Sequence, residues 1–122
     1  GATGFTGRLV AEYLLERYGA GGPLRWALGG RNPGKLEQVR SELGAAAAAL
    51  PIAVADANDG AALAALARRT RVVCTTVGPY ARYGTPLVAA CVETGTHYCD
   101  LTGEVQWMRR MIDAHHAAAV AS

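Results

Sequence analysis

Aromatic and charged residues are scarce in this sequence, and each shortage excludes a class of function. Phe, Trp and Tyr make up 7% of the 122 residues, too few for the stacking surfaces that bind single-stranded nucleic acid. Charged residues make up 18% and the formal net charge is +2, which is too small to favour nucleic acid or an anionic membrane. We therefore expect no nucleic-acid partner. Low charge beside 51% hydrophobic residues suits a sheet buried on both faces or a piece of a larger protein.

The sequence also lacks a long apolar run and a metal-binding pattern. No stretch approaches the roughly 18 uninterrupted apolar residues of a membrane-spanning helix, so we expect no membrane segment. The cysteines, Cys74, Cys91 and Cys99, are odd in number and form no C-x-x-C, which disfavours a zinc site or a disulfide framework. We expect no metal, buried free thiols and a cytoplasmic location.

What the sequence does contain is a regular alternation of helical and strand patterns. Helices are predicted over residues 6–17, 33–43, 61–69, 85–94 and 104–119, and strands over 24–28, 52–55, 72–77 and 97–101. Caps support several boundaries, with Asn32 and Asp59 before helices and Gly95 after one. The alternation predicts an α/β fold, a doubly wound parallel sheet of the Rossmann type.

The first seven residues, Gly1-Ala2-Thr3-Gly4-Phe5-Thr6-Gly7, form the motif around which the rest is arranged. They read G-x-x-G-x-x-G and open an amphipathic stretch, as in turns that hold a pyrophosphate at a helix N-terminus. Gly4 and Gly7 would allow close approach, and the N–H groups of Phe5 and Thr6 would donate to phosphate. The alternative is a tight turn without a ligand. Since such a motif normally follows a strand, we expect that the first strand is missing before Gly1 and that residues 1–122 are a partial domain.

Arg31 stands where an NAD-binding protein would place a carboxylate for the ribose 2′-hydroxyl. It follows Gly29-Gly30, and Lys35 comes one turn into the next helix. A guanidinium can form paired hydrogen bonds with a 2′-phosphate, so we predict NADP(H) rather than NAD(H). The alternative is a solvated charge at a helix start.

Asp56 follows the strand over residues 52–55. In this topology that strand end approaches the adenine, so we predict that Asp56 accepts from its amino group. A turn or capping role, shared with Asn58 and Asp59, is the open alternative.

Two further strand ends carry candidate residues. Gly78 and Pro79 end one strand and would line the pyrophosphate and nicotinamide ribose, while Tyr80 would contact substrate or simply pack. Asp100 lies at the carboxyl end of the last predicted strand and would face the same crevice. Thr102 is the expected N-cap of the last helix, with Glu104 in its first turn.

Together these stretches resemble the saccharopine dehydrogenase-like oxidoreductases, and most closely the bacterial trans-acting enoyl reductase branch. The matching segments are GATGFTGRLVAEYL (1–14), GGRNPGKLEQVRSELG (29–44) and VVCTTVGPYARYGTPLVAACVETGTHYCDLTGE (72–104). The last is the specific one. The resemblance covers nearly the whole chain.

The resemblance implies the NADP(H)-binding domain of an oxidoreductase that moves hydride to or from a carbon centre, with an enoyl or acyl chain or an imine as substrate. Family members continue into a second domain that shapes the substrate pocket, and no residue of this chain is assigned as the catalytic acid or base. A non-catalytic NADP(H) sensor and an extended short-chain dehydrogenase are the alternatives, and a homo-oligomer stays open. The implied cofactor positions are Gly4, Phe5, Thr6, Gly7, Arg31, Asp56, Gly78 and Pro79, and the implied substrate positions are Tyr80 and Asp100.

Overall fold

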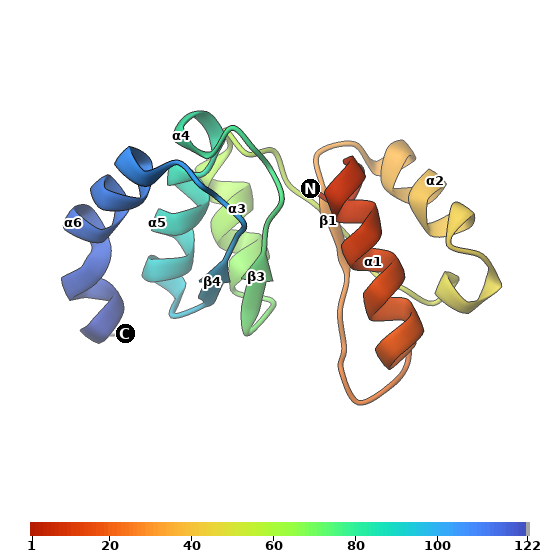
Figure 1. The fold of residues 1–122 in the computed structure, drawn as a ribbon. Helices are drawn as coiled ribbons and strands as arrows, with labels where there is room; N and C mark the ends of the chain where they lie inside the picture. Colours follow the sequence, from red (N-terminus) through yellow and green to blue (C-terminus); the bar gives the residue numbers. More distant parts are fainter. Residues whose placement is uncertain (122) are drawn as a thin grey trace. The chain divides into compact units, whose positions relative to one another are not determined.

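The computed structural model describes residues 1–121 and shows two compact units, Gly1–Ala55 and the residues from Asp56 onward. Each unit contains a two-stranded parallel sheet packed against helices (Figure 1). The α/β class is therefore confirmed, and every strand pair described in residues 1–121 is parallel. The expected single doubly wound sheet stays a prediction, because the strands described form two separate pairs.

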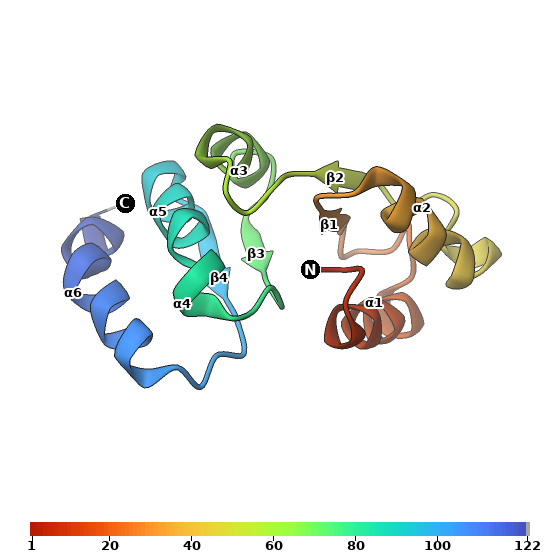
Figure 2. The ribbon, with the colours of Figure 1, turned by 90° about the horizontal axis from the view of Figure 1, so that it is seen from above.

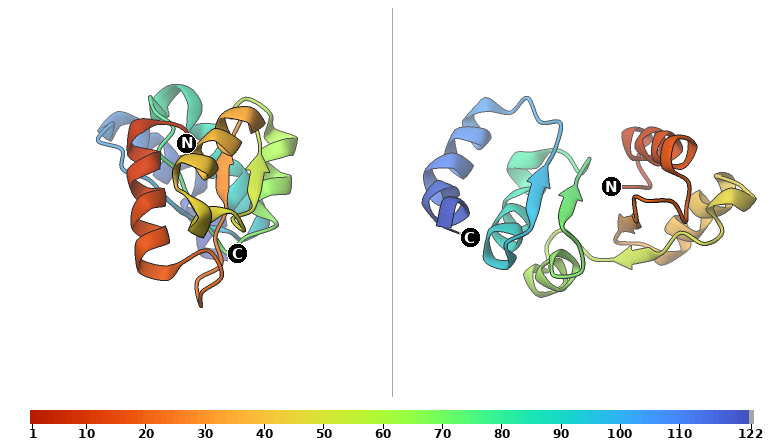
Figure 3. Two further views of the ribbon diagram at one scale, coloured as in Figure 1. Left: turned by 90° about the vertical axis from the view of Figure 1, so that its right-hand side faces the viewer. Right: turned by 90° about the horizontal axis from the view of Figure 1, so that it is seen from below.

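The first unit packs two helices against one strand pair. It contains α1 (Phe5–Tyr18), β1 (Leu28–Gly30), α2 (Pro33–Glu42), a short 3-10 turn (Ala45–Ala47) and β2 (Ile52–Val54). β1 pairs with β2 so that Leu28 lies opposite Ile52. The core consists of Ala11, Leu28, Leu36, Val39, Ala47 and Leu50. Figure 3 shows α1 and α2 beside the strands of this unit.

α1 packs through small residues rather than through large ones. Gly7 and Ala11, one helical turn apart, are buried. The larger apolar residues Leu9 and Tyr13 are 49% and 60% exposed. Small side chains bring the helix close to the sheet, so the face that contains Gly7 and Ala11 turns inward.

β1 begins later than the sequence predicts. Its pairing starts where the Leu28 N–H donates to the Pro51 carbonyl, at 2.9 Å. Of the expected strand over 24–28, residues 24–27 lie outside the strand. Gly29 and Gly30 belong to the strand instead of ending it. A Cβ on Gly30 would lie 3.3 Å from a Leu36 methyl carbon, so the missing side chain gives α2 room to pack.

The second unit has a helical layer on its sheet. It contains α3 (Gly60–Ala67), β3 (Val72–Cys74), α4 (Tyr80–Tyr83), α5 (Thr85–Thr94), β4 (His97–Cys99) and α6 (Val105–Ala121). Figure 2 shows α3 and α5 side by side next to the strands, with α6 packed beside α5. The short helix α4 was not expected from the sequence.

The β3–β4 sheet is not buried on both faces, which corrects the expectation for two thiols. Cys74 and Cys99 are exposed, whereas Cys91 in α5 is buried. Val72 is 50% exposed. Within residues 1–121, no helix of this unit packs on the face that carries these three exposed residues, because α3 and α5 pack with each other and cover the opposite side, as Figure 2 shows.

Candidate cofactor-binding site

The glycine turn at the start of the chain lies against the end of β1. The Ala2 N–H donates to the Gly29 carbonyl at 3.0 Å, and the Gly4 N–H closes the turn on the Gly1 carbonyl at 3.1 Å. Gly4 then caps α1 with extended backbone, and the helix starts at Phe5. These contacts hold the G-x-x-G-x-x-G segment and the end of β1 together in one unit.

Gly7 makes this close approach possible. A Cβ built on Gly7 would lie 2.0 Å from the Gly1 oxygen and 2.9 Å from the Ala2 Cα. Every residue except glycine would therefore push the helix away from the turn. A Cβ on Gly4 would meet the same oxygen at 3.5 Å, an ordinary contact, so Gly4 is not required for packing.

The N-terminus of α1 is open, unlike those of α2 and α3. Asn32 caps α2 by accepting from the Lys35 N–H, and Asp59 caps α3 by accepting from the Ala62 N–H, both at 2.9 Å. No side chain caps α1 within residues 1–121, and its first turn holds no acidic residue. Phe5 is 82% exposed.

This arrangement fits the phosphates of a dinucleotide. Exposed N–H groups in the first turn of a helix carry a partial positive charge and can donate to an anion. The lack of a competing carboxylate in this turn suits such a ligand. The predicted donors, the backbone N–H groups of Phe5 and Thr6, lie in this first turn, and their role toward the cofactor stays a prediction.

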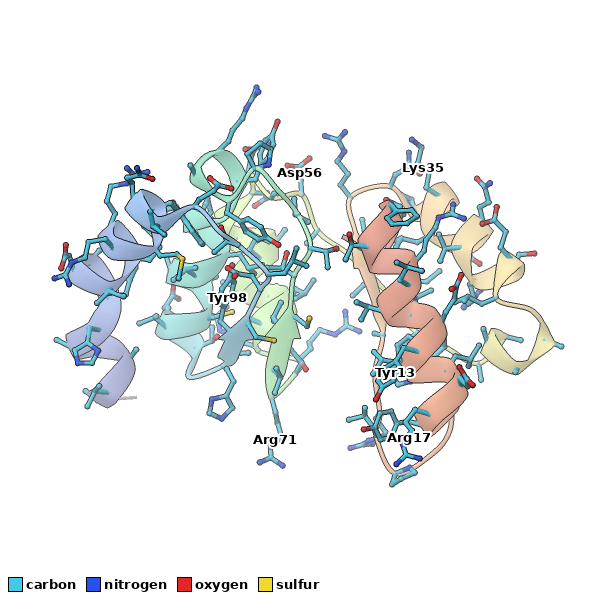
Figure 4. The ribbon with its side chains drawn as sticks, in the orientation of Figure 1. Tyr13, Arg17, Lys35, Asp56, Arg71 and Tyr98 are labelled. Carbon is cyan, nitrogen blue, oxygen red and sulfur yellow. The ribbon has the colours of Figure 1, made fainter. Side chains whose placement is uncertain are left out.

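Arg31 follows β1 at the same edge of the unit as the glycine turn. It is exposed, and among residues 1–121 no side chain forms an ion pair with its guanidinium. Lys35, in the first turn of α2, is also exposed (Figure 4). Two unpaired cations at the end of β1 suit a second phosphate better than a ribose hydroxyl.

Asp56 lies in a turn after β2. Its Oδ1 accepts from the Asn58 N–H at 2.8 Å and from the Asn58 side-chain amide at 3.1 Å. This is the turn geometry that the sequence left open as an alternative. The side chain is half-buried, and its adenine role stays a prediction.

In the second unit, the loops after β3 and β4 meet at the Glu104 carboxylate. Its Oε1 accepts from the Tyr80 N–H at 2.6 Å and its Oε2 from the Ala81 N–H at 2.8 Å. Glu104 therefore caps the N-terminus of α4 and joins the Gly78-Pro79-Tyr80 segment to the segment that follows Asp100. It precedes α6, which starts at Val105.

The expected roles of Thr102 and Glu104 need correction. The Thr102 hydroxyl accepts from the Glu104 N–H at 3.1 Å, which forms a local turn before α6. Glu104 lies outside the first turn of that helix and serves α4 instead. Sequence reasoning missed this role because the contact joins residues 23 and 24 positions apart. The signals available in the sequence were an acidic residue, Glu104, in one loop and a Gly-Pro break in another.

Tyr80 points inward. It is 5% exposed, its hydroxyl donates to the Thr75 carbonyl at 3.1 Å, and its ring centroid lies 5.7 Å from that of Trp107. Burial raises the pKa of its phenol. The packing role that the sequence left open describes this side chain here, and a substrate contact stays a prediction. Gly78 and Pro79 are exposed, and their cofactor role likewise stays a prediction.

Asp100 is tied to its own loop. One carboxylate oxygen accepts from the Tyr98 hydroxyl at 2.7 Å and the other from the Thr102 N–H at 3.0 Å. Burial, followed by this contact with Asp100, raises the pKa of Tyr98 well above its usual range. Tyr98 therefore remains a proton donor that orients the carboxylate, and the predicted substrate role of Asp100 is untested.

Comparison with known proteins identifies the family. The family described as the saccharopine dehydrogenase NADP binding domain matches residues 1–122. The chain belongs to this family. The match extends over the residues of both units, and it confirms the resemblance and NADP as the family's cofactor.

Relatives of this saccharopine dehydrogenase NADP-binding domain come from mycobacteria. A Mycobacterium tuberculosis protein whose name includes trans-acting enoyl reductase is 54% identical over 119 residues, covering 98% of this chain and 28% of its own length. A Mycobacterium leprae protein named trans-acting enoyl reductase is 52% identical over 122 residues, covering 100% of this chain and 28% of its own. The chain thus spans 28% of these relatives. No solved structure matches it significantly.

Two negative findings apply to residues 1–121 alone. No helix among them has the length and apolar character needed to cross a membrane. No cluster of three or more His, Cys, Asp or Glu side chains within them is arranged to hold a metal ion.

Proposed function

We propose that this chain is the NADP(H)-binding part of an oxidoreductase that moves hydride to or from a carbon centre. Membership of the NADP-binding domain family and the names of the relatives support the proposal. One observation carries the proposal. The N-terminus of α1, which Gly7 allows to lie close to the glycine turn, has no side-chain cap, and Arg31 lies at the same edge of the unit without an ion-pair partner among residues 1–121.

In this proposal the chain's own residues bind and orient the cofactor. Gly4 and Gly7 allow the pyrophosphate to approach the backbone closely, and the N–H groups of Phe5 and Thr6 donate to it. Arg31 pairs with the 2′-phosphate. The nicotinamide of bound NADP(H) supplies or accepts the hydride.

Three further residues complete the cofactor site in the proposal. Asp56 accepts from the adenine amino group, and Gly78 and Pro79 line the nicotinamide ribose. Glu104 fixes the segment that contains Gly78 and Pro79, because its carboxylate holds the Tyr80 and Ala81 N–H groups.

The proposed substrate is an unsaturated acyl chain. The relatives that share about half of the residues are named trans-acting enoyl reductase, which favours an enoyl substrate over an imine. Tyr80 and Asp100 would border it, and a second domain would shape the rest of the pocket. We also propose that the complete cofactor domain has a doubly wound parallel sheet and that the protein is cytoplasmic.

Steady-state turnover tests this function. The full-length protein is mixed with NADPH and an α,β-unsaturated acyl thioester, and the loss of NADPH absorbance is followed. We expect oxidation that depends on both protein and acyl substrate, with a saturated product of matching amount. NADPH binding without turnover on either acyl or imine substrates would instead indicate a sensor, and turnover on the imine alone would overturn the acyl assignment.

A further inference from the structure

Two thiols lie next to each other on the sheet of the second unit. Cys74 ends β3, Cys99 ends β4, and the two are register partners in the parallel pairing. Register partners on neighbouring parallel strands point to the same face of a sheet. Neighbouring strands lie about 4.7–4.9 Å apart, within the range of roughly 4.4–6.8 Å between the Cα atoms that a disulfide joins.

The two side chains already interact. Burial, followed by the charge of the Cys74 thiolate and a hydrogen bond with its side chain, raises the pKa of Cys99. Both residues are nevertheless exposed among residues 1–121. The third thiol differs, because Cys91 is 1% exposed and burial raises its pKa to about 11.

We propose that Cys74 and Cys99 form a reversible dithiol site that reacts with low-molecular-weight disulfides and ends as a Cys74–Cys99 disulfide. Nothing in the cofactor role uses these thiols, so the site is independent of the proposed oxidoreductase function.

The chemistry is two successive thiol–disulfide exchanges. The thiolate of one cysteine attacks one sulfur of the reagent, forms a mixed disulfide and releases one thiolate. The thiol of the other cysteine loses its proton to solvent and attacks the protein sulfur of the mixed disulfide, which releases the second thiolate. The protein loses two protons and two electrons, and the reagent disulfide takes up both as two thiols.

Peptide mapping of the full-length protein tests the site. Reduced protein is incubated with glutathione disulfide under native conditions, blocked with an alkylating reagent, digested and analysed by mass spectrometry. We expect cross-linked peptides that contain Cys74 and Cys99, with a loss of two hydrogen masses and reversal by dithiothreitol. Cys91 should be alkylated only after denaturation. The proposal is overturned if both thiols stay unmodified in the native protein. It is also overturned if the protein carries only a glutathione adduct without the cross-link.

Single variants separate pairing from simple exposure. Cys99→Ser removes one thiol of the pair, so a stable glutathione adduct should accumulate on Cys74. Cys91→Ser should form the cross-link to the same extent as the parent. If Cys74 of the Cys99→Ser variant cross-links to another cysteine as much as Cys74 of the parent cross-links to Cys99, the pair of Cys74 and Cys99 is not the site. Peptide mapping of the unsubstituted protein decides whether the disulfide forms, so the test does not depend on the folding of any variant.

Discussion

Gly7 occupies a position where the backbone leaves no space for a side chain, since a Cβ would lie 2.0 Å from the Gly1 oxygen. We predict that Gly7→Ala in the full-length protein lowers the free energy of unfolding by about 1–3 kcal/mol, the usual cost of overpacking, and weakens NADPH binding as α1 shifts. Thermal unfolding and a cofactor titration measure the two effects.

Gly60→Ala is the matched control for Gly7. Gly60 starts α3, and a Cβ there meets nothing within 4 Å. Alanine favours a helix over glycine by up to about 1 kcal/mol, so this variant should be as stable as the parent or slightly more so. If Gly7→Ala unfolds at the same temperature as Gly60→Ala, the close approach at Gly7 is not real.

Arg31 decides between the two dinucleotides. We predict that Arg31→Ala weakens NADPH binding by about 1.5–3 kcal/mol, as expected for a lost charged hydrogen bond, and weakens NADH binding much less. Arg17→Ala is the control, because Arg17 is exposed on the last turn of α1, far along the helix from the glycine turn (Figure 4). Equal losses for NADPH and NADH in the Arg31 variant would contradict the 2′-phosphate assignment.

Among the elements, α4 depends on a residue outside itself. Only four residues long, it is too short to be stable alone, and Glu104 satisfies two of its N–H groups. We predict that Glu104→Ala destabilises the protein by about 1.5–3 kcal/mol and speeds hydrogen exchange in peptides that contain residues 80–83.

Glu93→Ala serves as the comparison for Glu104. Glu93 forms an exposed ion pair with Arg68 at 2.9 Å, and such pairs contribute at most about 1 kcal/mol. Hydrogen exchange over residues 80–83 should not change in this variant. If Glu104→Ala has the same stability and the same hydrogen exchange over residues 80–83 as Glu93→Ala, Glu104 does not cap α4.

Helix boundaries could be predicted from the sequence because their signals are local. Asn32 and Asp59 cap α2 and α3 as expected, and Gly95 ends α5 in the left-handed conformation with φ of 62°. Strands were less predictable, since pairing partners set their ends. β1 starts at Leu28 because Pro51, far along the chain, offers a carbonyl there, and no local pattern in residues 24–28 records that.

At the scale of the whole molecule, the cofactor motifs could be predicted from the sequence, whereas the long-range contacts could not. The glycine turn and Arg31 stand in short, contiguous segments, so residue type and spacing were enough. The Glu104 contact and the thiol pair of Cys74 and Cys99 depend on which strands pair and which loops meet. Each of the two units contains its own parallel strand pair, while the family match spans residues 1–122.

A calorimetric titration of the full-length protein with NADPH and, separately, with NADH tests the cofactor assignment most directly. We predict saturable binding of NADPH and weaker binding of NADH, by about 1.5–3 kcal/mol, because only NADPH carries the phosphate that Arg31 would hold. A protein that binds neither dinucleotide, or binds NADH at least as tightly as NADPH, would contradict it.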